Sequence, residues 1–168
     1  MTSSILFVCL GNICRSPLVA AVARQRFAEA GLAIEVDSCG TGGWHVGQGA
    51  DARSIRVAEE AGYSLLDHRV RQLAADDFRR FDAVLAMDDD NLAALRGKCP
   101  AEYGDRVMLF LDAARLDHYA PPIVPDPYYE DLDAFRHVLR LAELGVDGLM
   151  GRLRRGESLS TPPRRAAR

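Results

Sequence analysis

The stretch Ile5-Leu-Phe-Val-Cys-Leu-Gly-Asn-Ile-Cys-Arg-Ser-Pro17 decides the fold of this 168-residue chain. The run Ile5–Val8 is apolar without interruption, which is typical of a strand buried on both faces. Gly11 and Asn12 enter left-handed backbone conformations at low cost, so they predict a sharp turn. Ser16 and Pro17 predict the N-cap and first residue of a helix that runs to about residue 30. A strand, a tight loop and a helix in this order indicate an α/β protein.

The loop after this strand has the composition of an anion site that holds a reactive thiol. Amides of a tight loop and of a helix N-terminus bind anions. These amides, the Ser16 hydroxyl and the Arg15 guanidinium would all favour the ionised form of Cys9. Arg15 also offers paired donors that match two oxygens of a phosphoryl group. The pattern therefore predicts transfer of a phosphoryl group to the sulfur of Cys9.

Strands and helices alternate along the rest of the chain. Apolar runs predict three further strands, at 33–38, 83–86 and 107–111. Periodic apolar residues between N-caps and glycines predict helices at 51–61, 75–80, 88–96 and 131–155, with Asp51 and Asp88 as N-caps and Gly31, Gly62 and Gly97 as helix ends. The alternation predicts one α/β domain over residues 1–155, a doubly wound four-stranded parallel sheet with helices on both faces. The loops that follow the strands (9–16, 39–50, 87–91 and 112–130) should meet at one edge of the sheet, where such folds bind ligands.

Composition narrows the class of protein further. The net charge of −3 does not favour nucleic-acid binding, and no apolar run approaches the length of a membrane span. The N-terminus lacks the basic residues of a secretion signal, so a cytoplasmic protein without membrane partners is predicted. The four cysteines are expected to be reduced, and with no Cys-x2-Cys pair and scattered histidines, no metal or other cofactor is predicted.

Several segments resemble the low-molecular-weight protein tyrosine phosphatases. Residues 8–17 are similar to the signature loop of that family, and the likeness continues in family order through 37–47, 67–72, 87–91 and 126–129. It covers about residues 4–155. The resemblance implies the phosphotyrosine phosphatase type I fold, with strand order 2-1-3-4. It also implies that phosphate or sulfate binds in the loop, whose substrate-binding residues would be Leu10, Gly11, Asn12, Ile13, Cys14 and Ser16.

The resemblance also indicates partners for Cys9 and Arg15. Asp126 lies in the loop after the fourth strand, between two prolines, and matches the general acid and base of the family. Trp44, Tyr128 and Tyr129 match aromatic residues that flank the substrate, which favours an aryl phosphate. Two further positions, Ser38 and His68, match residues that hydrogen-bond toward Asn12 and support the loop. The implied substrates are phosphotyrosine proteins, a tyrosine kinase being one candidate.

The predicted phosphatase chemistry does not explain three further features of the sequence. Cys14 has the place of a redox partner that could close a disulfide with oxidised Cys9. Cys39 stands where the family commonly has alanine, and the sequence indicates no function for it. Residues 156–168 are rich in proline, serine and arginine, so a disordered basic tail is expected there.

Three alternatives remain open at the level of sequence. Arsenate reductases share a similar fold and loop but need a relay of further cysteines, whereas Cys39 and Cys99 are far apart in this chain. Phosphoarginine phosphatases of the same family typically carry threonine where this chain has Ile13, which favours phosphotyrosine. A non-catalytic module that binds phosphate or senses redox state is disfavoured by the presence of Cys9, Arg15 and Asp126 together.

Overall fold

The computed structural model describes residues 1–116 and 119–161, and in these residues four strands form one parallel sheet. The strands are β1 (Ser4–Cys9), β2 (Glu35–Gly40), β3 (Ala83–Ala86) and β4 (Val107–Leu109), in the order β2-β1-β3-β4. β1 is central and pairs with both β2 and β3. The predicted fold class and strand order are confirmed.

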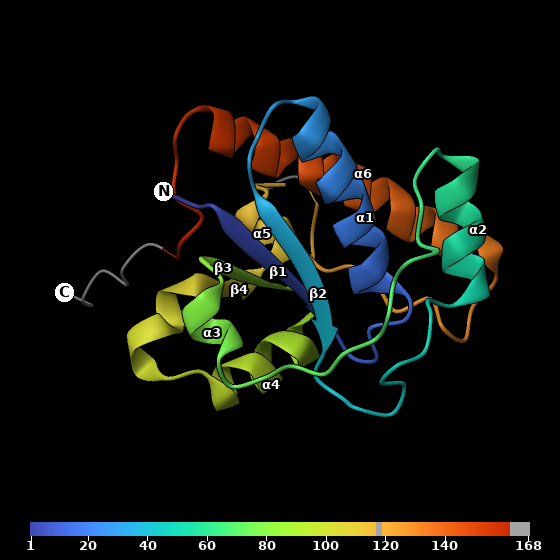
Figure 1. The fold of residues 1–168 in the computed structure, drawn as a ribbon, viewed down its shortest axis with the longest axis horizontal. Coiled ribbons are helices and arrows are strands. Elements are labelled where there is room, and N and C mark those ends of the chain that lie inside the picture. The colour runs from blue at the N-terminus through green and yellow to red at the C-terminus, as the bar shows by residue number, and fades with distance from the viewer. Residues whose placement is uncertain (117–118, 162–168) are drawn as a thin grey trace.

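Helices cover both faces of the sheet. Figure 1 shows α1 (Arg15–Glu29) and α6 (Leu132–Arg154) on one side, and α3 (Asp77–Arg80) and α4 (Asp89–Lys98) on the other. Ile5 and Phe7 of β1 belong to the core beneath α1 and α6, whereas Leu6 and Val8 belong to the core on the α3 and α4 side. Because successive side chains of a strand point to opposite faces, burial on both sides requires the uninterrupted apolar run.

The remaining elements connect these layers. They are α2 (Ala52–Glu60), a short 3-10 helix η1 (Ala101–Arg106) and α5 (Phe110–Ala113). The N-caps of α2 and α4 are confirmed, because Asp51 accepts a hydrogen bond from the Arg53 amide and Asp88 accepts one from the Asn91 amide, both at 2.8 Å. Asp131 caps α6 in the same way.

Several predicted boundaries differ from the structure: the strand predicted at 33–38 is Glu35–Gly40, and the helix predicted at 75–80 is Asp77–Arg80. Helix α1 begins at Arg15 with Cys14 as N-cap, and the Ser16 hydroxyl lies against Cys9 instead of capping the helix. Gly97 lies inside α4, which continues to Lys98. Strand β4 ends at Leu109, and the apolar residues that follow it form α5. The residues concerned can adopt either conformation, so local preference alone does not fix where these elements begin and end.

The first part of the C-terminal tail also differs from the expectation of disorder. Leu159 is buried in the core, and its amide donates to Thr2 Oγ1 at 2.9 Å. The Thr161 amide donates to the Asp105 carbonyl at 2.8 Å. The buried Leu159 side chain and these two hydrogen bonds therefore hold the segment up to Thr161 against the domain. Residues 162–168 lie outside the described part of the chain.

The loops that follow the strands meet at one edge of the sheet. The amides of Thr41 and Gly42, just after β2, donate to the carbonyls of Cys9 and Leu10 at 3.0 and 2.9 Å. Gly40 permits this approach, since a Cβ there would lie 2.8 Å from the Leu10 carbonyl oxygen. The Val124 amide, from the segment after β4, donates to the carbonyl of Met87 after β3 at 2.8 Å. No helix in the described residues is long and apolar enough to cross a membrane.

Candidate active site

Cys9 ends β1 at this edge, and its sulfur faces two hydrogen-bonding groups. The Asn12 amide donates to Cys9 Sγ at 3.3 Å, and Ser16 Oγ lies 3.0 Å from the same sulfur. Both contacts come from the loop and the first turn of α1. An amide N–H and a hydroxyl can both donate a hydrogen bond to sulfur.

Asn12 is the centre of the loop's support. It is fully buried and has a φ of 57°, the left-handed conformation that the sequence predicted. Its side-chain nitrogen donates to Ser16 Oγ at 2.9 Å and to Ser38 Oγ at 3.0 Å. Its carbonyl oxygen lies 2.8 Å from His68 Nε2. Ser38 and His68 thus lie where the resemblance implied, and burial lowers the pKa of His68, which favours the neutral ring.

Arg15 is buried beside the sulfur and is oriented by the loops after β3 and β4. Its Nη1 donates to Asp88 Oδ2 at 2.6 Å and to the Val124 carbonyl at 3.0 Å. Its Nη2 lies 3.7 Å from Asp126 Oδ2. The pairing of Asp88 with Arg15 was missed by the sequence reasoning, which identified Asp88 first as a helix cap. The signal that could have found it is the position of Asp88 directly after β3, at the edge of the sheet that holds the site.

Asp126 projects from the segment after β4 toward Arg15. Its side chain is about half exposed, and its Oδ1 accepts a hydrogen bond from the Tyr128 amide at 3.1 Å. The two flanking prolines restrict the backbone on either side. Asp126 therefore combines a fixed position with access to solvent, which a group that exchanges protons with water needs.

These groups line a pocket of about 210 Å³. The predicted residues that line it are Cys9, Leu10, Gly11, Ile13, Cys14, Arg15, Trp44, Asp126, Tyr128 and Tyr129. The other four predicted site residues, Asn12, Ser16, Ser38 and His68, do not line it and instead form a hydrogen-bonded group around Asn12. His45 also lines the pocket and was missed, although it follows Trp44 directly in the chain.

Aromatic side chains form the outer wall of the pocket. The rings of Tyr128 and Tyr129 meet edge to face, with centroids 4.9 Å apart. Trp44 stands on the loop after β2 and is largely exposed. Aromatic edges around a narrow pocket favour a flat ring in the substrate.

The remaining cysteines differ in their relation to the pocket. Cys14 lines it, and burial raises the pKa of its thiol to about 12. Cys39 is fully buried among the apolar side chains on the α3 and α4 side of the sheet, the face opposite to the core that contains Cys9 and Cys14. All four cysteines lie in the described part of the chain and are free thiols. Because Cys39 lies on the opposite face of the sheet, they do not form the relay of further cysteines that an arsenate reductase needs.

A parallel α/β sheet with a cysteine and an arginine at the carboxyl end of its central strand can bind an anion beside a nucleophile, as a phosphatase does. The model of the low molecular weight phosphotyrosine protein phosphatase family matches residues 4–159, and the chain belongs to this family of hydrolases. A low molecular weight protein-tyrosine-phosphatase of Streptomyces coelicolor is 44% identical over 165 residues, which cover 92% of this chain and 95% of the relative. The YfkJ phosphatase of Bacillus subtilis is 35% identical, covering 93% and 99%.

Solved structures agree with this assignment. A protein tyrosine phosphatase from Entamoeba histolytica, with Hepes in the active site, has a TM-score of 0.86 and 36% identity, and the match covers 92% of this chain and 99% of that one. The tyrosine phosphatase Wzb from Escherichia coli K30, in complex with sulphate, has a TM-score of 0.79 and 31% identity, covering 91% and 99%.

Proposed function

We propose that this phosphatase hydrolyses phosphotyrosine in proteins through a phosphocysteine intermediate on Cys9. The observation that carries the proposal is the set of groups around the Cys9 sulfur. The sulfur accepts a hydrogen bond from the Asn12 amide and faces the Ser16 hydroxyl, and the buried guanidinium of Arg15 lies beside it. An anion held under a cationic fork is suited to attack a bound phosphate dianion. The tyrosine phosphatase Wzb was solved in complex with sulphate, which supports binding of a phosphate-like anion by this chain, and inorganic phosphate is the expected product ligand.

The reaction has two steps. The Cys9 thiolate attacks phosphorus, the bond to the tyrosine oxygen breaks, and the Asp126 carboxyl gives its proton to the departing oxygen. The Asp126 carboxylate then takes a proton from a water molecule, which attacks phosphorus and breaks the sulfur bond to release phosphate. Arg15 binds phosphoryl oxygens in both steps, and Asp88 together with the Val124 carbonyl holds its guanidinium in place. No metal takes part.

The aromatic wall supports the choice of substrate. Trp44 and Tyr128 line the same pocket as Cys9, so we expect a substrate to carry its phosphate on an arm long enough to pass these rings. A phenyl ring is long enough and fits between aromatic edges, whereas the short arm of phosphoserine is not. We therefore expect phosphotyrosine proteins as substrates, with a tyrosine kinase among the candidates, in the reducing cytoplasm that free thiols require.

Hydrolysis of p-nitrophenyl phosphate in the presence of EDTA tests the nucleophile. We expect turnover by the unsubstituted protein, and a loss of about 10³-fold or more in the Cys9→Ser variant. Cys99→Ser is the matched control, because this thiol is half-buried and does not line the pocket. Full activity of Cys9→Ser, or a requirement for added metal, would overturn the mechanism.

Leaving groups of different basicity test Asp126. We expect Asp126→Asn to slow the hydrolysis of phenyl phosphate by about 10²–10³-fold, and that of an ester with a more acidic phenol less, because a weak base leaves without a proton. Asp133→Asn, which changes an exposed carboxylate at the start of α6, should leave both rates unchanged. An equal loss on both esters would exclude Asp126 as the acid.

Competing substrates test the alternatives. Phosphotyrosine peptides should be hydrolysed faster than phosphoserine and phosphoarginine peptides. Faster hydrolysis of the phosphoarginine peptide would identify the protein as a phosphoarginine phosphatase instead. Arsenate reduction with a thiol reductant would indicate a reductase, and binding of phosphate without any turnover would indicate a non-catalytic module. The burial of Cys39 on the opposite face of the sheet argues against the reductase.

A further inference from the structure

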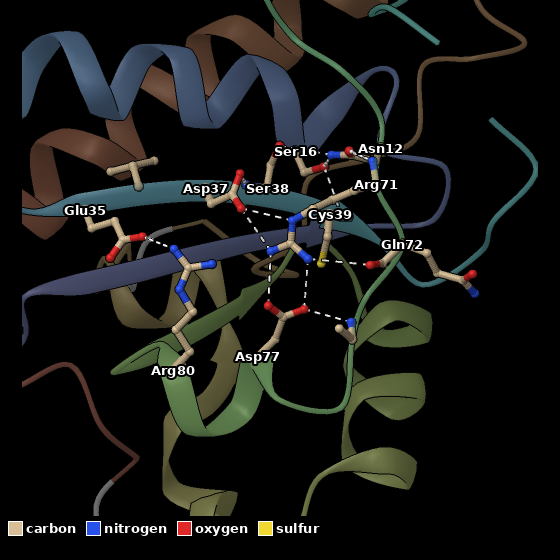
Figure 2. Close-up of polar contacts among 12 residues, drawn as sticks. Asn12, Ser16, Glu35, Asp37, Ser38, Cys39, Arg71, Gln72, Asp77 and Arg80 are labelled. Atoms are coloured by element: carbon tan, nitrogen blue, oxygen red, sulfur yellow. Dashed lines mark hydrogen bonds and ion pairs between the residues drawn. The ribbon is translucent and has the colours of Figure 1, made fainter. Parts of the chain in front are cut away.

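Arg71 lies outside the pocket, yet its guanidinium is held between two carboxylates from different elements. Its Nε donates to Asp37 Oδ2 of β2 at 3.0 Å. Its Nη1 and Nη2 donate to the two oxygens of Asp77, the first residue of α3, at 3.0 and 3.1 Å. Figure 2 shows the guanidinium between the two acids, and Asp77 is almost fully buried. The planar guanidinium gives two of its donors to Asp77 and a third donor to Asp37. It therefore has little freedom to move.

The backbone of the same residue faces the loop that supports Cys9. The Arg71 amide donates to Asn12 Oδ1 at 3.1 Å, and the Arg71 carbonyl accepts from the Gly40 amide at 3.0 Å. The Arg71 amide is therefore positioned by the end of β2 on one side and by its own clamped side chain on the other. Among the described residues between α2 and α3, Arg71 alone donates a backbone hydrogen bond to the Asn12 side chain.

The Arg71 amide sets the direction of a chain of hydrogen bonds. A backbone N–H can only donate, so Asn12 must turn its oxygen to Arg71 and its nitrogen to Ser16. Ser16 Oγ accepts from that nitrogen, which leaves the hydroxyl proton free to donate onward. Its nearest acceptor is Cys9 Sγ at 3.0 Å, and the Cys39 carbonyl lies farther away at 3.4 Å. With the amide of Asn12 reversed, Ser16 would instead donate to Asn12, and the sulfur would lose this donor.

We propose that Arg71 is a positioning residue, whose clamp between Asp37 and Asp77 directs the Asn12 and Ser16 hydrogen bonds toward the Cys9 thiolate. The proposal rests on the proposed function, because it concerns the same nucleophile. The Arg71 guanidinium does not touch the Cys9 sulfur. In this proposal its ion pairs on the α3 side of the sheet nevertheless influence the reactivity of Cys9 at the edge of the sheet.

Few charged groups compete with this effect at Cys9. Arg15 from α1 is a cation that faces the sulfur, and it is itself paired with Asp88 and near Asp126. His45, from the loop after β2, is a titratable group that lines the same pocket as Cys9. The neighbouring thiols of Cys14, from the loop, and Cys39, from β2, have pKa values that burial raises, so they remain neutral. His68, on the far side of Asn12, has a pKa that burial lowers. The loss of a neutral donor should therefore be visible in the ionisation of Cys9.

Alkylation of Cys9 by iodoacetate, followed across pH by mass spectrometry, tests the proposal. In Arg71→Gln we expect the pH of half-maximal alkylation rate to rise by about one unit, the effect of losing a hydrogen bond to a charged group. The acid limb of kcat/KM for p-nitrophenyl phosphate should move by the same amount. Arg71→Lys, which keeps the charge but cannot bridge both acids, should move it less.

Arg26→Gln is the matched control. Arg26 also binds two carboxylates, Glu143 and Asp147, but it joins α1 to α6 away from the pocket. Both glutamine variants should lower the melting temperature, and only Arg71→Gln should move the alkylation midpoint. If Arg71→Gln does not fold, Asp37→Asn takes its place, since it removes one arm of the clamp and leaves the Asp77 pair.

The outcomes separate the two proposals. A folded Arg71 or Asp37 variant with an unchanged midpoint, or an equal shift in Arg26→Gln, would overturn the positioning role. If Cys9 of the unsubstituted protein instead reacts only at about pH 8.5 and above, like an ordinary thiol, and no turnover is seen, the proposed function itself fails.

Discussion

The loop that surrounds Cys9 and the aromatic wall above it are built in opposite ways. In the loop, Asn12 and Ser16 are fully buried, and each makes several hydrogen bonds within the protein. In the wall, Trp44 is 70% exposed and Tyr129 is 93% exposed. The groups that carry the proposed chemistry are thus held in one arrangement before any ligand arrives, whereas the groups proposed to recognise the substrate are free to adapt to it.

Part of the wall is supported by an arginine of a neighbouring helix. The guanidinium of Arg53, from α2, lies 5.6 Å from the centroid of the Tyr128 ring, and it also donates to the Glu130 carbonyl at 3.2 Å. Such contacts are worth little at an exposed site. Substitutions in the wall should therefore change binding modestly, and those in the loop should change both chemistry and stability.

The largest expected effect comes from Asn12→Ala, which breaks the loop. It leaves the Arg71 amide and two serine hydroxyls without their partner and places alanine at a φ of 57°. We expect kcat/KM to fall about 100-fold and the free energy of unfolding to fall by about 2–4 kcal/mol. Steady-state kinetics and urea denaturation measure both. The control is Asn91→Ala, at a buried asparagine whose side-chain oxygen has no partner, and it should retain activity.

The second prediction concerns the disulfide proposed between Cys9 and Cys14 after mild peroxide treatment. Peroxide oxidises Cys9 to the sulfenic acid, the Cys14 thiolate attacks this sulfur to form the S–S bond, and the hydroxide that leaves takes up a proton to become water. Because the pKa of Cys14 is raised to about 12, its thiolate fraction and the closure rate should rise about tenfold per pH unit between about pH 7 and 9. Mass spectrometry of quenched samples measures the rate. A rate independent of pH, or sulfinic acid on Cys9 without a disulfide, would contradict the prediction.

Trp44→Ala tests the prediction that the exposed aromatic wall contributes to substrate binding and not to the chemical step. The loss of one exposed ring at the pocket should raise KM for a phosphotyrosine peptide about fivefold, the effect of about 1 kcal/mol, with kcat little changed. Leu144→Ala, at another exposed apolar residue on α6, should change neither constant. A large fall in kcat would mean that the wall also positions the reacting groups.

The smallest expected effect is on the pH dependence of stability. Burial lowers the pKa of His68 below its ordinary 6.5, so below that pH the unfolded chain binds a proton before the folded one does. This contribution is present above pH 6.5 and is lost as the pH falls through the lower folded value. His68→Gln should therefore lose stability less steeply than the unsubstituted protein on acidification. Melting temperatures between about pH 8 and 5 measure the difference, and parallel curves would contradict the prediction.

Some features could be predicted from local sequence because their causes lie within a few residues. The buried strand Ile5–Val8, the left-handed Asn12 and the caps Asp51 and Asp88 follow from side-chain type and backbone preference alone. The place of the site at the carboxyl ends of the strands followed from the alternation of strands and helices. The resemblance to the family then supplied the strand order and Asp126.

Other features were decided only when the chain folded. The pairing of Arg15 with Asp88 joins residues 73 positions apart, the Arg71 amide reaches Asn12 across 59 positions, and the Leu159 amide reaches Thr2 across 157. The neighbouring sequence indicates a role for Arg15, but it names neither Asp88 as the partner of Arg15 nor Asn12 as the partner of the Arg71 amide, and it does not distinguish the start of the tail from a disordered segment. Sequence by itself determined which groups could carry the chemistry, since that depends on residue type and local conformation. Only the tertiary structure decided which of them share a hydrogen bond, because that depends on where distant segments pack.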